Sequence, residues 1–431
     1  MNAVPMRTRG GWTSLPFDLV RAFTGNSRLP VYEFEKAKVQ KRHSRLRPLA
    51  TANEDISFGA WRLAHALKKA ECAREPNAVL LAVGAAGFLI EHMHLLDWRG
   101  EELRLAAGMS DYYADFSRTS LAGRLAQGMA LLFLEGQGYA YAGRLSAEIK
   151  RYNGSKVAQA VLKSKAKKKA SMPSRAPDFL VENGKGERAL AEAKGAFVGP
   201  NETCNIKGSL KDALDQLEGW DRVLVPQPRK SFAIGTFLRE ADDLFEEPSL
   251  LAFVDPRPGE PEDPIEIPPD AVRRSNYASW LALMGFADAA ERLRTGAGEP
   301  RRRTARVLRL GGHSYVVTMA SIRPWAPRGR VDDEVWEFID EWPYWFLEPF
   351  AGVCLEVIGL DLDVVRRLGP AASQPGVSSL MSLEPHVERD IPSEIDGVRF
   401  YGSVLTDGSL LGELRMPRHH RVRFEPVEVE L

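Results

Sequence analysis

Two carboxylates and an ammonium group lie close together in the stretch Pro177–Lys194, which reads PDFLVENGKGERALAEAK. Asp178 opens one apolar segment, and Glu192 and Lys194 close the next. Between the segments, Gly184-Lys185-Gly186 supplies glycine where a three-residue hairpin loop needs a positive φ. The stretch therefore predicts an antiparallel hairpin that carries acidic and basic groups at one end.

The register of this hairpin decides whether the two carboxylates meet. With the three-residue loop, Glu182 faces Arg188, and the two form a cross-strand pair of opposite charge. Asp178 then lies opposite Glu192 on the same face of the hairpin. A tight two-residue turn would instead place Asp178 opposite Ala189 and separate the carboxylates. The charge pair favours the first register.

Carboxylates brought together in this way predict a site for a hard divalent cation. Mg²⁺ prefers oxygen ligands and keeps several waters, and Mn²⁺ accepts the same ligands. Such an ion polarises a phosphate and lowers the pKa of a bound water. Lys194 lies two residues beyond Glu192 and shares its face, so its ammonium group can orient that water or offset developing charge. This chemistry is metal-dependent phosphodiester hydrolysis.

The segment before the hairpin is strongly basic. Between residues 141 and 176 there are ten basic residues, and Glu148 is the only acidic one. A basic segment beside a phosphodiester site would attract nucleic-acid backbones without regard to sequence. A disordered lysine-rich insertion is the alternative. The candidate nucleic-acid-binding residues are Lys163, Lys165, Lys167, Lys168, Lys169 and Arg175.

The flanking patterns predict the elements that would hold the hairpin. Helical spacing runs over Leu121–Glu135, with Ser120 as its cap, and over Ser209–Trp220, with Ser209 as its cap. Short strands are expected at Gly138–Ala142, Phe232–Leu238 and Leu250–Val254. The order is helix, three strands, helix, two strands, so residues 116–255 predict a mixed α/β layer.

The remaining residues predict flanking regions. Residues 1–115 are expected to be mostly helical, and Pro256–Asp270 is rich in proline and acid, as an extended linker would be. Residues 271–431 suggest a separate α+β domain with two hairpins. One hairpin would turn at Gly311-Gly312-His313 and the other at Asp407-Gly408.

Net charge, cysteine spacing and the length of the apolar segments limit the class of protein to which the chain can belong. The chain has 431 residues, no net formal charge and three widely spaced cysteines. The most apolar window, Ala78–Ile90, is thirteen residues long, whereas a spanning helix needs about 20. We therefore expect a cytoplasmic protein without a membrane partner, with no disulfide framework.

The central motif resembles that of the PD-(D/E)XK nuclease superfamily, whose members have the restriction-endonuclease-like fold. Here it reads Pro177-Asp178, thirteen intervening residues, then Glu192-Ala193-Lys194, and the resemblance extends over roughly residues 116–255. It implies metal binding by Asp178, Glu192 and the main-chain carbonyl of Ala193. It also implies that Lys194 positions the attacking water.

Two further positions bear on this resemblance. Many members of the superfamily carry an additional Glu on the preceding helix, and the matching position here is Gln127, which puts a two-metal arrangement in doubt. Gln216, followed by Trp220, is similar to the Gln-x-x-x-Tyr element of the exonuclease-like branch, with Trp in place of Tyr. A surface glutamine is the alternative for Gln216.

The resemblance implies a Mg²⁺-dependent nuclease, with DNA favoured as substrate over RNA. A nuclease-like domain between such flanking regions resembles prokaryotic restriction or antiphage proteins, for which a homodimer or a defence-system partner protein is expected. Repair and mobile-element nucleases are the alternatives. The alternative is a nuclease fold that no longer cuts and instead binds nucleic acid or acts as a scaffold. A third interpretation is a chance match, with the C-terminal domain serving protein interaction.

Overall fold

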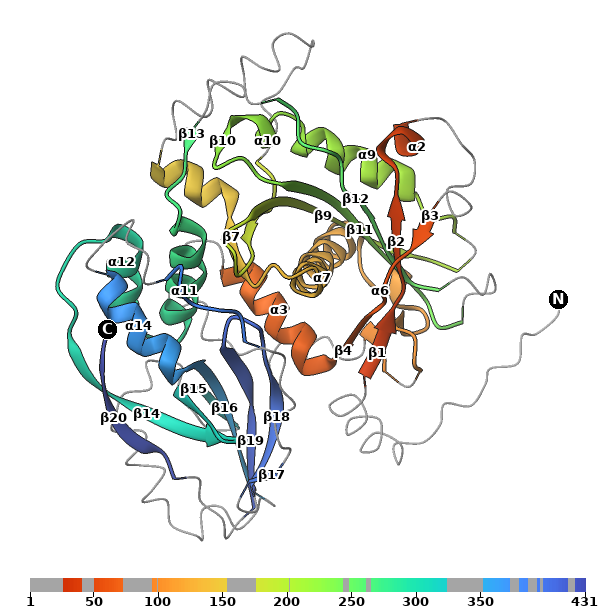
Figure 1. Cartoon of the computed structure of the whole chain (residues 1–431). Coiled ribbons are helices and arrows are strands. Elements are labelled where there is room, and N and C mark those ends of the chain that lie inside the picture. The colour runs from red at the N-terminus through yellow and green to blue at the C-terminus, as the bar shows by residue number, and fades with distance from the viewer. Residues whose placement is uncertain are drawn as a thin grey trace.

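Two seven-stranded sheets organise the part of the chain that the computed structural model describes. The class is mixed α/β (Figure 1). The described residues are 26–40, 50–72, 95–98, 100–152, 176–200, 202–242, 248–260, 265–323, 352–372, 380–386, 394–395, 398–417 and 423–431.

The central sheet holds the predicted hairpin in its interior. Its strand order is β3-β2-β12-β11-β9-β8-β7. The pairs β7–β8, β8–β9, β11–β12 and β2–β3 are antiparallel, whereas β9–β11 and β12–β2 are parallel. The strands are β2 (Val31–Phe34), β3 (Ala50–Ala52), β7 (Tyr141–Arg144), β8 (Phe179–Glu182), β9 (Arg188–Val198), β11 (Lys230–Arg239) and β12 (Leu250–Val254).

Two helices cover the middle of this sheet, which lies between them in Figure 1. The helices are α7 (Asp115–Gly136) and α9 (Ile206–Leu217). Because the sheet is covered on both faces, its inner strands are rich in apolar residues, and all five residues of β12 are buried. Gly195 in β9 allows α7 to come close, since a Cβ there would lie 2.1 Å from the carbonyl oxygen of Ala122.

The hairpin has the predicted register. Leu180 is paired with Leu190, and Glu182 with Arg188. The Asn183 amide donates to the Glu187 carbonyl at 3.0 Å, which closes a loop of three residues. The last of these, Gly186, has φ 80°, a conformation that favours glycine. The prediction based on the charge pair and the glycine loop is therefore confirmed.

The order of elements in residues 116–255 also agrees with the prediction, but several boundaries differ. The first helix begins at Asp115, so Ser120 lies inside it and is not its cap. The second begins at Ile206, where the Asn205 side chain accepts from the Gly208 amide, so Ser209 is not the cap. It ends at Leu217, and Trp220 opens the separate helix α10 (Trp220–Val223). A short additional helix over 145–152 follows β7.

The described part of residues 1–115 is mixed, and the expectation of a mostly helical region is wrong there. Strands β2 and β3 extend the central sheet, so a boundary at residue 115 does not separate this region from it. The other elements are β1 (Asn26–Leu29), α2 (Lys36–Gln40), β4 (Ile56–Gly59), α3 (Ala60–Cys72), β5 (Leu96–Asp97), β6 (Arg104–Leu105) and α6 (Met109–Tyr112).

The described part of residues 256–270 is docked onto the central domain, which corrects the expectation of an extended linker. Strand β13 (Ile265–Glu266) pairs with β10 (Leu224–Val225). The Arg188 guanidinium also donates to the carbonyl oxygens of Ile267 at 3.2 Å and Pro269 at 2.9 Å. These contacts tie the segment to the hairpin.

The second sheet has only antiparallel pairs, in the order β17-β18-β19-β16-β15-β14-β20. Both predicted hairpins are present, as β14–β15 and β18–β19. The elements are α11 (Ala271–Leu283), α12 (Ala287–Thr295), β14 (Arg302–Leu310), β15 (His313–Arg323), β16 (Gly352–Asp361), α14 (Leu362–Ala372), β17 (Glu394–Ile395), β18 (Val398–Val404), β19 (Ser409–Pro417) and β20 (Glu425–Glu430).

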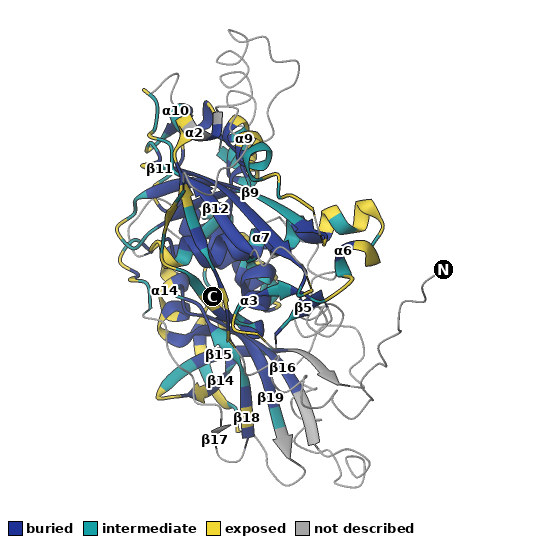
Figure 2. Ribbon diagram, turned by 90° about the vertical axis from the view of Figure 1, so that its right-hand side faces the viewer, coloured by how far each residue is buried: buried dark blue, intermediate teal, exposed yellow. Residues whose placement is uncertain are grey.

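One continuous core joins the two sheets, and dark-blue buried elements run through both halves of Figure 2. Helices α3 and α11 supply polar contacts at this junction. Lys69 on α3 pairs with Asp407, Asn276 on α11 donates to the same carboxylate at 2.7 Å, and Trp280 donates to the Gly359 carbonyl at 2.7 Å. None of the helices in the described residues has the length and apolarity needed to span a bilayer.

Candidate active site

Four predicted site residues meet at the open end of the hairpin. Asp178 immediately precedes β8, Glu192 and Lys194 lie on β9, and Gln216 lies on α9. The Asp178 amide donates to Glu192 Oε2 at 3.0 Å, and Lys194 Nζ donates to Glu192 Oε1 at 2.8 Å. Lys194 also donates to the side-chain oxygen of Gln216. The hairpin register and the position of α9 together produce this arrangement.

Asp178 accepts hydrogen bonds from three directions. Its Oδ2 accepts from the main-chain amide of Ala193 at 3.2 Å. Its Oδ1 accepts from Gln127 Nε2 at 3.0 Å and from Arg144 Nη1 at 2.9 Å. Gln127 therefore occupies the place that the resemblance assigned to it, beside the first carboxylate, and it brings an amide there instead of a third acid.

Glu192 has the most perturbed acidity in the site. Its side chain is 5% exposed. The pKa of this carboxyl is raised to about 7, mainly by burial and then by the nearby Asp178 charge, against the lowering effect of Lys194. Two acidic groups this close together resist ionising together, and a cation between them relieves that conflict.

Lys194 is more accessible than either carboxylate, with its side chain 30% exposed against 18% for Asp178 and 5% for Glu192. It bridges Glu192 on the sheet and Gln216 on the helix, so the position of its ammonium group is defined by both. Gln216 thus points at the site and not into solvent. Trp220, the second residue of the Gln-x-x-x-Trp element, is buried in the core and lies outside these contacts.

Arg144 is the member of the site that the sequence did not reveal. It was counted among the basic residues before the hairpin, yet its guanidinium lies inside the cluster with 6% of its side chain exposed. The pairing of β7 with β8 is the signal that could have placed Arg144 in the site. Because β7 runs antiparallel to β8, the end of β7 meets the beginning of β8, and Arg144 is paired with Phe179 beside Asp178.

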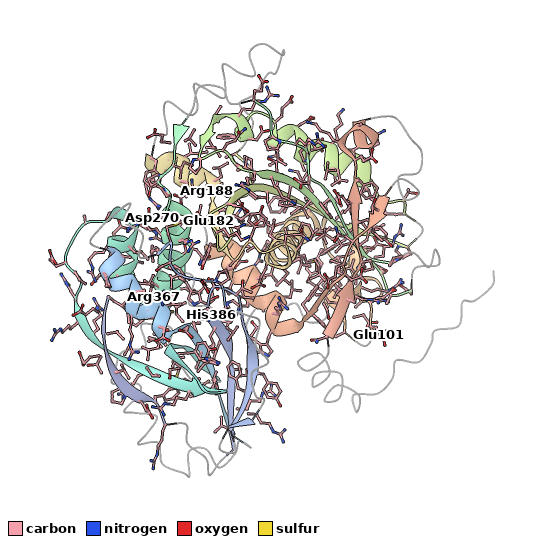
Figure 3. The ribbon with its side chains drawn as sticks, viewed as in Figure 1. Glu101, Glu182, Arg188, Asp270, Arg367 and His386 are labelled. Atoms are coloured by element: carbon pink, nitrogen blue, oxygen red, sulfur yellow. The ribbon has the colours of Figure 1, made fainter. Side chains whose placement is uncertain are left out.

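A buried ion cluster supports the hairpin near its loop. Glu182 accepts from Arg188 at 3.4 Å and from Arg273 on α11 at 2.6 Å, and all three side chains are buried. Arg273 also donates to the Gly184 carbonyl at 2.9 Å. In Figure 3, Glu182 and Arg188 lie together on the hairpin near Asp270. This cluster holds the loop end, and hence the register that places Asp178 opposite Glu192.

The donor set fits one hard divalent cation better than two. It offers the carboxylates of Asp178 and Glu192, and the main-chain carbonyl of Ala193 directly after Glu192 in sequence. These are oxygen ligands of the kind that Mg²⁺ and Mn²⁺ use. No group of three or more acidic, histidine or cysteine side chains suited to a metal is found within the described residues.

The predicted nucleic-acid-binding residues Lys163, Lys165, Lys167, Lys168, Lys169 and Arg175 lie outside the described residues. Within the described part of the basic segment, Arg151 pairs with the buried Glu148 at 3.5 Å and Arg144 joins the site. A comparison with models of known protein families, with curated proteins and with solved structures finds no match.

Proposed function

We propose that this chain is a divalent-metal-dependent nuclease with a restriction-endonuclease-like core, most simply one that acts on DNA. The observation that carries the proposal is the hairpin geometry. The Asp178 amide donates to the Glu192 carboxylate, and the Asp178 carboxylate accepts from the Ala193 amide. Lys194 donates to the Glu192 carboxylate as well. The order of elements from α7 to β12 supports the same proposal.

In the proposed reaction, Asp178, Glu192 and the Ala193 carbonyl hold Mg²⁺ or Mn²⁺. When bound, the ion acts as a Lewis acid toward the phosphate and makes water more acidic. Lys194 places an ammonium donor at the edge of the two carboxylates, where it orients water and offsets charge on the phosphate. Gln216 fixes the direction of that donor through its side-chain oxygen.

The test is cleavage of linear and circular DNA in Mg²⁺, with and without a chelator. Removal of a positioned electrostatic group typically costs about 10²–10³ in rate, so we expect losses of that order in Asp178→Asn and Lys194→Met. The matched control is Lys185→Met, an exposed lysine at the loop of the same hairpin. Equal cleavage by the wild type, Asp178→Asn and Lys194→Met would overturn the proposal.

A second candidate is a nuclease fold that binds nucleic acid without cutting it. The observation that favours it is the Arg144–Asp178 ion pair at 2.9 Å, together with the amide of Gln127 in place of an acid. Salt-sensitive DNA binding with no Mg²⁺- or Mn²⁺-dependent cleavage would support it. Cleavage that is lost in Glu192→Gln would exclude it.

A further inference from the structure

Arg144 is held in the site by contacts that do not depend on Asp178. Its Nη2 donates to Gln127 Oε1 at 2.7 Å and to the Ala70 carbonyl at 3.0 Å. Its guanidinium also stacks over the Phe179 ring, 4.7 Å from the ring centre. Ala70 lies in the last turn of α3, where carbonyls lack helical partners and a cation is favourable. Arg144 is therefore anchored, and moving it out would leave that carbonyl without its donor.

The hydrogen bonds that Asp178 already accepts show which side of its carboxylate can still bind a cation. A carboxylate oxygen accepts about two hydrogen bonds. Oδ1 already accepts two, from Gln127 and from Arg144, whereas Oδ2 accepts one, from the Ala193 amide. Each Glu192 oxygen likewise accepts one. The side of Asp178 that faces Gln127 is thus saturated, and the side that faces Glu192 can still bind a cation.

We propose that Arg144 stands permanently in the place of a second divalent cation, so that the site takes a single cation, on the Glu192 side of Asp178. Gln127 belongs to the same arrangement, because its amide bridges Arg144 and Asp178 where an acid would attract another metal ion. The inference rests on the proposed metal site and adds its stoichiometry and the residues that set it.

The test is calorimetric titration of the full chain with Ca²⁺, which reports binding independently of cleavage. We expect one Ca²⁺ per wild-type chain and two per chain in the double variant Arg144→Gln with Gln127→Glu. In the single variant Arg144→Gln, the first ion should bind about tenfold tighter or more, since the variant removes a positive charge that contacts one of the proposed ligand carboxylates. Arg144→Lys keeps the charge and should keep one site.

The control is Arg124→Gln, about one turn before Gln127 on α7, whose guanidinium donates to Glu71 at 2.8 Å. It should bind one ion with unchanged affinity. If Arg144 served only to cap α3, every variant would bind one Ca²⁺ per chain. A double variant that binds one Ca²⁺ therefore overturns the proposal. Two ions in the wild type would also overturn it while leaving the metal site intact. No binding by the folded wild type would instead contradict the metal site itself.

A measurement on the wild type covers the case in which the buried variants do not fold. Arginine side-chain NMR should show that the Arg144 guanidinium remains ordered and keeps its chemical shift pattern when Ca²⁺ saturates the site. Release of that guanidinium on Ca²⁺ binding would show that the ion displaces it, and the proposal would fail.

Discussion

Replacing His65 with glutamine should make the protein more resistant to mild acid. His65 lies on α3, fully buried against the second sheet, with Nδ1 2.8 Å from Ser403 Oγ and its ring stacked on Trp280. The pKa of this imidazole is lowered to about 3, mainly by burial, although the Asp407 charge acts in the opposite direction. The Lys69 charge contributes to the lowering.

The magnitude follows from proton linkage. At pH 5 an unfolded histidine, with a pKa of about 6.5, is protonated, whereas folded His65 is neutral. The unfolded state therefore binds more protons, and the free energy of unfolding falls as the pH drops from above 6.5 toward 3. Between pH 7 and pH 5, this one group should cost about 2 kcal/mol of stability.

The assay is urea unfolding of the wild type and His65→Gln at pH 7 and pH 5. Glutamine keeps a group that can bond Ser403 and does not titrate. The difference between the two pH values should therefore be about 2 kcal/mol smaller in the variant. His313→Gln, at the beginning of β15, is the control and should behave as the wild type. An identical pH dependence in the wild type and His65→Gln would refute the reasoning.

Three further changes test the site and its support. Gly195→Ala should destabilise the protein by about 1–3 kcal/mol in denaturant unfolding, because the new Cβ would lie 2.1 Å from a carbonyl oxygen of α7. An unchanged free energy of unfolding would contradict that contact. Arg273→Met should lower the free energy of unfolding by about 3–5 kcal/mol in the same measurement, since it leaves the buried Glu182 carboxylate with one partner fewer. A loss of stability below about 1 kcal/mol would be too small for that explanation. In the metal-free protein, carboxyl NMR should give Glu192 a pKa of about 7, and Lys194→Met should raise this pKa because the variant removes the ammonium group that lowers it. A lower Glu192 pKa in the variant would show that the assignment of causes is wrong.

The hairpin could be predicted from sequence because its determinants are local. A glycine loop and one charge pair six residues apart select the register, and the register then places Asp178 by the alternation of side chains along a strand. For Gln216 the sequence left two alternatives, a residue that faces the site and a surface glutamine, and its contact with Lys194 supports the first.

What could not be predicted depends on contacts between distant segments. Arg144 enters the site because β7 pairs with β8 and because α3 offers the Ala70 carbonyl, 74 residues earlier in the chain. Strand β2 was missed because its partner β12 lies more than 200 residues downstream. The helix cap was wrong for a more local reason, because Ser209 was predicted as the cap and the chain uses Asn205, four residues earlier.

The pairing of β2 with β12 has a consequence for how the chain is synthesised and divided. Strand β2, which borders β12, is made early and cannot pair with β12 until almost the whole central domain has been translated. Folding is therefore expected to be slow, since non-local pairing delays the first productive contacts. A fragment cut at residues 116–255 would leave the apolar β12 as a bare edge, which invites pairing with other chains and aggregation.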